Sequence, residues 1–230
     1  MKLILTCEHG GNQVPFEYLT YFSEAGRALD SHRGYDPGAL DLFRYLLPLA
    51  DQTYYSETSR LFVELNRSLH HPKLFSEYSN KFTTSQKKTI LEQYYQPYRN
   101  TVEAGIAESL EGGREVLHIS VHSFTPVLEG EVRKTDIGLL FDPSRREEKE
   151  FSKKFKSSLK AIDPTLLTRF NYPYLGIADG LPTYLRRLFP KAYHGIELEV
   201  NQKFVNKENQ MQLNVKRSIL LALKQIMQEW

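Results

Sequence analysis

Two histidine-containing segments each follow a short apolar run of the chain. Residues 8–12 read Glu-His-Gly-Gly-Asn, and residues 122–126 read His-Ser-Phe-Thr-Pro. Imidazole nitrogen is a common ligand of zinc, and adjacent glycines let a loop pass close to a substrate. We therefore interpret His9 and His122 as candidate metal ligands, although the first segment alone is also typical of a turn with a solvated histidine.

His118 shares the predicted strand with His122. Alternation along a strand places His118, Ser120 and His122 on one face. At roughly 3.3 Å per residue, the two histidines would lie about 13 Å apart, which is too far for both to bind one ion. We predict that His118 is a half-buried structural histidine and that His122, at the end of the strand, is the better ligand.

Two glutamates close the last predicted strand. Glu197 and Glu199 point to the same face and lie about 6.6 Å apart along the strand. Like charges this close on a buried face raise the pKa of at least one carboxyl group, which suits a general base that activates water. Either glutamate fits that role, and an exposed acidic face on an edge strand remains the alternative.

Three further charged residues lie in two polar segments. Asp36 precedes Pro37 and is compatible with a ligand or with a helix cap. Arg60 and Arg67 flank an apolar run and could form bidentate pairs with a substrate carboxylate. Single arginines more often form surface ion pairs, so this interpretation depends on the other segments.

Apolar runs that alternate with amphipathic ones predict an α/β fold in one domain, residues 1–230. The sheet is expected to be mostly parallel or mixed, with helices on both faces and ligands at the carboxyl ends of the strands, as in phosphorylase-like or hydrolase-like α/β folds. Ser144 with Glu147, and Asn206, are expected helix caps, and Pro97 should kink or divide its helix. The predicted strands are 3–7, 52–57, 60–65, 115–122, 137–141 and 193–200, and the predicted helices are 37–50, 84–111, 144–161, 181–188 and 207–229.

The composition excludes several classes of protein. The chain has 230 residues, a formal net charge of +2 and 40% hydrophobic residues, as an ordinary globular protein has. The single cysteine, Cys7, excludes an internal disulfide bond. The charges form no concentrated basic stripe, so we expect no nucleic-acid partner. The apolar run at the N-terminus is too short for a signal peptide or a membrane span, so we expect a cytoplasmic protein without a membrane partner.

Taken in order, these segments resemble the N-formylglutamate amidohydrolase family from the first strand to about residue 203. The His-Ser-Phe-Thr-Pro run is the most specific element. The resemblance implies an α/β fold similar to zinc carboxypeptidases and aspartoacylases, and a metal-dependent hydrolysis that removes formyl or acyl groups from acidic amino acids. The other matching segments are residues 8–12 with Pro15, 34–39, 59–61, 66–67, 137–138, 171–174 and 199–201.

The resemblance also implies roles for individual residues. His9 and His122 would bind a divalent metal, expected to be Zn²⁺, with Asp36 as the third ligand and Glu8 as the alternative. Glu199 would be the general base. Arg60 or a loop N–H would stabilise the oxyanion. The residues expected to orient an N-acyl amino acid are Asn66, Arg67 and Ser123.

This chain departs from the family at one position. The family usually has an arginine two residues after the catalytic glutamate, and this chain has Asn201. The resemblance therefore supports the type of reaction more strongly than the substrate. A zinc peptidase or deacylase acting on another small molecule, and a relative that binds such a molecule without cleaving it, are the alternatives.

Overall fold

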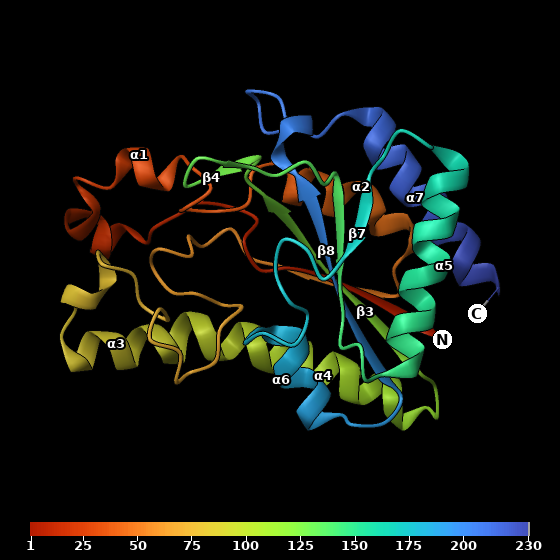
Figure 1. Ribbon diagram of the computed structural model, residues 1–230. Coiled ribbons are helices and arrows are strands. Elements are labelled where there is room, and N and C mark those ends of the chain that lie inside the picture. The colour runs from red at the N-terminus through yellow and green to blue at the C-terminus, as the bar shows by residue number, and fades with distance from the viewer. Residues whose placement is uncertain (230) are drawn as a thin grey trace.

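The computed structural model describes residues 1–229 and has a mixed six-stranded sheet with helices on both faces (Figure 1). The α/β class predicted from the sequence is confirmed. The strands of this sheet are β1 (Lys2–Cys7), β2 (Gln52–Tyr55), β3 (Val116–Phe124), β6 (Ile137–Leu140), β7 (Thr168–Phe170) and β8 (Tyr193–Asn201). Their order is β2-β1-β3-β8-β6-β7. The four strands β2, β1, β3 and β8 are parallel to one another. Strand β6 is antiparallel to β8, and β7 is parallel to β6.

Helices and a small hairpin complete the fold. The strands β4 (Val127–Leu128) and β5 (Glu131–Val132) pair with each other outside the main sheet. The helices are α1 (Gly26–Leu29), α2 (Ala39–Leu46), α3 (Thr84–Ile90), α4 (Gln96–Glu111), α5 (Arg146–Ile162), α6 (Leu181–Leu188) and α7 (Leu213–Glu229). In the part of the chain that the structure describes, no helix is both long and apolar enough to cross a membrane.

The two faces of the central strands have different neighbours. On β3, Leu117, Ile119 and Val121 belong to the largest apolar cluster, together with side chains of α2, α5 and α7. Each large apolar side chain buried in this way stabilises the fold by about 1.5–3 kcal/mol. The intervening residues of β3, including His118 and His122, face the side of α4 and α6. The polar face is therefore fixed by the burial of the apolar one, because a shift of one residue would exchange them.

A separate cluster of aromatic side chains supports the segment that runs from residue 59 to residue 67. Phe62 is fully buried in it and contacts the rings of Tyr18, Phe22 and Phe82, which come from distant parts of the chain. Figure 1 shows α1 and α3 on the opposite side of the molecule from α5 and α7. We call the cluster around Phe62 the aromatic lobe. Besides Phe62 and the three rings that it contacts, its members include Leu61, Val63, Leu65, Leu74, Ile90 and Tyr95.

The predicted strand at residues 60–65 is wrong. The segment forms turns, in which Phe62 N–H donates to the Ser59 carbonyl at 2.9 Å, and it belongs to no strand. Its apolar residues satisfy the pattern of a buried strand, but they are buried by the aromatic lobe and have no neighbouring strand to pair with. Strand β7 and the β4–β5 hairpin were not predicted, because strands of two or three residues carry too little periodicity.

Three predicted helix caps are also wrong. Helix α2 begins at Ala39 rather than Pro37, because Gly38 has a φ of +79° and the Asp36 side chain forms no cap. Helix α5 has Arg145 at its N-cap position, whereas Ser144 donates to Asp142. Helix α7 begins at Leu213, and the Asn206 side chain instead accepts from two N–H groups of the preceding turn.

The helix that contains Pro97 is divided, as predicted. A π-helical turn, Leu91–Tyr95, separates α3 from α4 immediately before the proline. A proline ring clashes with the carbonyl group four residues earlier, and a π turn opens the helix at that point.

Candidate metal centre

The carboxyl ends of three adjacent strands bring the candidate residues together. Strand β3 lies between β1 and β8, with His122 opposite Glu199 and Ser120 opposite Glu197. His9 follows β1 directly. The ring centroids of His9 and His122 are 5.0 Å apart, although 113 positions separate the residues in the sequence numbering (122 − 9).

One carboxylate oxygen lies between the two imidazoles. Asp36 Oδ2 is 3.3 Å from His9 Nδ1 and 2.9 Å from His122 Nδ1. All three side chains are buried, and their ligand atoms lie within 4.8 Å of one another. Two imidazole nitrogens and one carboxylate oxygen are a donor set that catalytic zinc sites use, with a fourth position left open. This cluster therefore fits a divalent metal.

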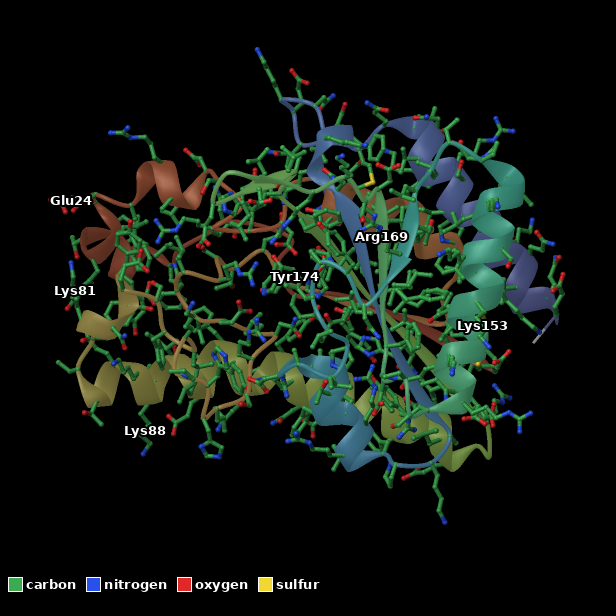
Figure 2. The ribbon with its side chains drawn as sticks, in the orientation of Figure 1. Glu24, Lys81, Lys88, Lys153, Arg169 and Tyr174 are labelled. Carbon is green, nitrogen blue, oxygen red and sulfur yellow. The ribbon has the colours of Figure 1, made fainter. Side chains whose placement is uncertain are left out.

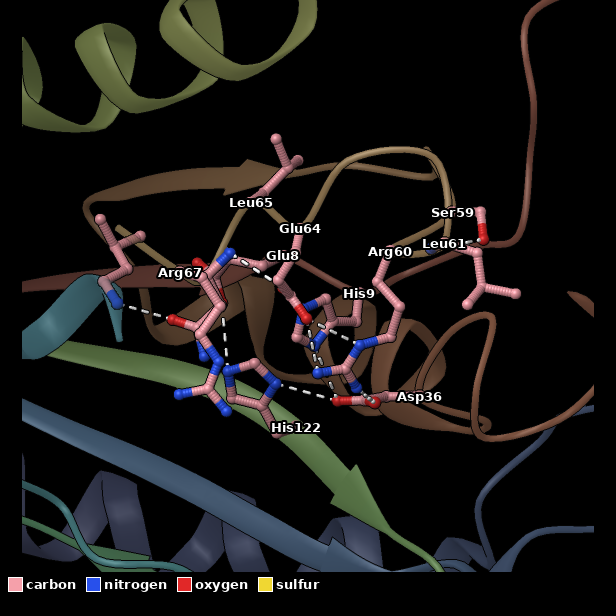
Figure 3. A network of polar contacts seen from close by, with 12 residues as sticks. Glu8, His9, Asp36, Ser59, Arg60, Leu61, Glu64, Leu65, Arg67 and His122 are labelled. Carbon is pink, nitrogen blue, oxygen red and sulfur yellow. Dashed lines mark hydrogen bonds and ion pairs between the residues drawn. The ribbon is translucent and has the colours of Figure 1, made fainter. Parts of the chain in front are cut away.

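The other nitrogen of each imidazole also contacts a carboxylate (Figure 3). His9 Nε2 pairs with Glu64 at short range, and His122 Nε2 lies 3.2 Å from Glu8 Oε2. Carboxylates in this position fix the tautomer and the orientation of histidines that bind a metal through their remaining nitrogen. Both Nδ1 atoms are thereby directed to the same point.

Glu8 lies on the far side of the His122 ring from Asp36. Its carboxylate accepts hydrogen bonds from Tyr98 at 3.0 Å and from Ser120 at 2.6 Å. Burial raises the pKa of Glu8, but the hydrogen bond and the positive charge of His122, together with the hydrogen bond from Ser120, outweigh burial and lower the pKa overall. Of the two carboxylates that the sequence left open as the third ligand, Asp36 is the one that lies between the Nδ1 atoms.

Glu64 is a site residue that the sequence reasoning missed. It lies inside the run misinterpreted as a strand, and its only signal was a charged residue within an apolar segment. Arg60 Nε donates to Glu64 Oε2 at 2.9 Å, and Arg60 Nη1 donates to Asp36 Oδ1 at 3.1 Å. Arg60 thus links the carboxylate between the imidazoles to the carboxylate behind His9, and it also lines the cavity in front of them.

The substitution Glu64→Gln is expected to weaken zinc binding by about 10- to 100-fold, because His9 loses the carboxylate that orients it. Competition with a zinc-binding dye would measure this affinity. Glu77→Gln is the matched control, since Glu77 also pairs with an arginine, Arg33, but on the surface. Equal zinc affinity of wild type and Glu64→Gln would show that Glu64 does not support the site.

A cavity of about 210 Å³ opens in front of the cluster. Glu197 and Glu199 both line it. Glu199 Oε2 is buried and has no hydrogen-bond partner among the described residues. Burial, reinforced by the negative charges of Asp36 and Glu197, raises the pKa of Glu199 to about 8. An unpartnered oxygen of this kind is suited to accept a proton from a molecule in the cavity.

The three residues expected to orient a substrate also line this cavity. Ser123 Oγ donates to the Pro37 carbonyl at 2.7 Å and accepts from Gln202, so this hydroxyl already has two partners. Asn66 Oδ1 accepts from the Leu181 N–H at 2.6 Å. Arg67 donates to a backbone carbonyl, that of Asp179, and forms no ion pair with a carboxylate of the described residues.

His118 and Asn201 have structural contacts. His118 is fully buried rather than half-buried, and it contacts Thr6 Oγ1 at 2.8 Å and Tyr193 Oη at 2.7 Å. Asn201 is fully buried, and its Nδ2 donates to the carbonyls of Arg133 at 3.0 Å and Thr135 at 2.8 Å. Neither residue lines the cavity.

The fold and the site together define a class, that of α/β proteins with a cluster at the strand ends that could hold a metal. A family model described as N-formylglutamate amidohydrolase matches residues 1–205. The chain belongs to the N-formylglutamate amidohydrolase family, and it is an enzyme that acts on an amide.

Two solved structures share the fold over nearly the whole chain. The gene product Atu2144 from Agrobacterium tumefaciens is 26% identical, with a TM-score of 0.77, and the match covers 98% of this chain and 92% of that one. The N-formylglutamate amidohydrolase from Ralstonia eutropha JMP134 is 15% identical, with a TM-score of 0.72, and the match covers 100% and 93%. No curated protein sequence matches the chain.

Proposed function

We propose that this enzyme hydrolyses the amide bond of an N-formyl or N-acyl amino acid, with an acidic amino acid such as glutamate as the favoured product. The observation that carries the proposal is the cluster of His9, Asp36 and His122 beside the unpartnered oxygen of Glu199, in a member of this family. The proposed metal is Zn²⁺, which His9, Asp36 and His122 would hold. When bound, such an ion lowers the pKa of a water molecule to about 7 and polarises a carbonyl group.

The protein side chains supply the proton transfers. Glu199 accepts a proton from the water molecule while the oxygen of that water forms a bond to the amide carbon. The same carboxyl group then returns the proton to the amide nitrogen as the C–N bond breaks, which releases the amine and the carboxylic acid. Arg60 lines the cavity and contacts Asp36, and we propose that it stabilises negative charge on the former carbonyl oxygen.

The walls of the cavity provide orientation. Arg67 offers donors to a substrate carboxylate, because it forms no ion pair with the described residues. Asn66 and Ser123 line the same space and are proposed to orient the substrate, while their hydrogen bonds to Leu181 and Pro37 hold the adjacent segments. A small N-acyl amino acid is compatible with a cavity of about 210 Å³.

A panel of substrates with and without a chelator tests the proposal. The zinc-loaded protein is expected to hydrolyse N-formylglutamate, to lose this activity after the metal is removed, and to regain it when zinc is added. Hydrolysis of dipeptides alone would instead identify a peptidase. Activity that persists in the metal-free protein would contradict the proposed use of the metal.

A further inference from the structure

Arg133 lies beside the cavity without a carboxylate partner among the described residues. Its guanidinium group packs over two rings, with Cζ 5.4 Å from the centroid of Tyr174 and 5.9 Å from that of Phe124. Nη1 also lies 3.4 Å from the Tyr174 hydroxyl. Both aromatic residues line the cavity, so Arg133 is one side chain removed from it.

The backbone holds this arginine in place. The β4–β5 hairpin turns through Glu129 and Gly130, which both have positive φ values, as a tight hairpin turn requires. Arg133 follows the hairpin, and its N–H donates to the Pro126 carbonyl at 2.8 Å. Its carbonyl accepts from Asn201 Nδ2, which anchors this segment to the end of β8. The guanidinium group is therefore presented by a braced segment rather than by a free loop.

The charges around the cavity explain why a further cation is needed. The lining of the cavity includes four carboxyl groups, those of Asp36, Asp179, Glu197 and Glu199, beside the guanidinium groups of Arg60 and Arg67. Arg60 is already paired with Asp36 and Glu64. An N-acyl glutamate carries two carboxylates, and Arg67 can pair with only one of them in the proposed orientation.

We propose that Arg133 binds the side-chain carboxylate of the substrate and thereby selects acidic N-acyl amino acids over neutral ones. This inference deepens the proposed function and depends on it. Tyr174 lines the cavity and is about half exposed, at 47%, so the Arg133 guanidinium group that packs over its ring lies toward the open side of the cavity. A planar guanidinium group stacked on aromatic rings keeps its N–H edge free for bidentate pairing with a carboxylate.

N-formylglutamate and N-formylglutamine provide a matched test, because they have nearly the same shape and differ in one negative charge. The wild-type enzyme is expected to prefer N-formylglutamate. Arg133→Gln is expected to lower kcat/KM for N-formylglutamate by about 10- to 100-fold, as loss of hydrogen bonds to a charged group does, and to change the value for N-formylglutamine by less than about threefold. Arg133→Lys, which keeps the charge but loses the planar group, should retain part of the preference.

Arg169→Gln is the matched control. Arg169 Cζ also packs over a tyrosine ring, that of Tyr172, at 5.5 Å, and Arg169 extends from β7 (Figure 2). Tyr172 does not line the cavity, whereas both rings under Arg133 do. Arg169→Gln should leave kcat/KM unchanged for both N-formylglutamate and N-formylglutamine. Equal losses for both substrates in Arg133→Gln, or an unchanged ratio in both Arg133 variants, would overturn the role of Arg133.

Calorimetric binding of the same two compounds to the zinc-loaded proteins separates this inference from the proposed function. If the wild type cleaves neither compound, the proposed hydrolysis fails, and the preference in binding still tests Arg133. A preference for N-formylglutamate that disappears in Arg133→Gln supports the inference. No preference in the wild type overturns it.

Discussion

Replacing Glu199 with glutamine is expected to lower kcat for the amide substrate by about 10²- to 10⁴-fold, the usual contribution of a general base. Glutamine has nearly the same shape as glutamate, but it cannot accept the proton of the attacking water. The zinc content and the melting temperature should remain close to those of wild type, because Glu199 has no hydrogen-bond partner to lose at its buried oxygen. Steady-state kinetics, elemental analysis and a thermal melt measure the three quantities.

Glu197→Gln is the matched control for this substitution. Glu197 lies on the same face of β8 and lines the same cavity, but it is opposite Ser120 rather than His122. We expect the larger loss of kcat for Glu199→Gln. A larger loss for Glu197→Gln would transfer the role of base to Glu197, and full activity of both variants would remove this face of β8 from the chemistry.

The pH dependence of the reaction follows from the raised pKa of Glu199. The proposed base, Glu199, is active when it is deprotonated, so kcat should rise as pH increases through the pKa of Glu199. That pKa is about 8 in the metal-free protein, and a cation nearby favours the carboxylate and lowers it. The rising limb of the rate profile is therefore expected below pH 8 in the zinc-loaded enzyme, and it should be absent from the residual activity of Glu199→Gln.

Replacing His122 with alanine is expected to abolish stoichiometric zinc binding and, with it, the metal-dependent activity. The substitution removes one of the two proposed nitrogen ligands and leaves Asp36 and Glu8 buried without the imidazole that lies between them. Elemental analysis should give close to one zinc ion per chain for wild type and nearly none for the variant. Hydrolysis is expected to fall to the rate of the metal-free protein.

A second buried histidine serves as the control for this variant. His194 lies in the neighbouring strand β8, but at the opposite end of the sheet from the cluster, and its ring has no hydrogen-bond partner in the described chain. His194→Gln should therefore retain zinc. Stoichiometric zinc in His122→Ala would contradict the proposed ligand set, and loss of zinc from both variants would indicate damage to the sheet instead.

The residues of the cluster that the sequence identified are those that follow or end strands. His9, His122 and Glu199 could be predicted because apolar runs show where strands end, and parallel strands bring those ends to one edge. Asp36 was kept as a ligand only through the resemblance, since a carboxylate before a proline is equally typical of a helix cap. In the structure, the positive φ of Gly38 shifts the start of the helix, and Asp36 turns toward the imidazoles.

Glu64 and Arg133 could not be found in this way. Glu64 reaches His9 only because the turns of residues 59–67 are buried by the aromatic lobe, whose members are far apart in the sequence. Arg133 is placed by a two-residue strand pair and by the side chain of Asn201. Local periodicity carries no information about such contacts between distant segments. The same limit explains the wrong helix caps, because the side chains of Ser144 and Asn206 form hydrogen bonds with groups outside the helix ends.

The metal-binding histidines of this proposal and their electrostatic surroundings belong to different parts of the molecule. The sheet and the turn that follows β1 supply the imidazoles and Glu199, whereas the turns packed into the aromatic lobe supply Arg60 and Glu64. Substitutions that repack the aromatic lobe can therefore change the positions of Arg60 and Glu64, and with them the substrate selectivity, during evolution. The imidazoles and Glu199 would stay in place. Members of one family could diverge in substrate by this route without any change in the imidazoles.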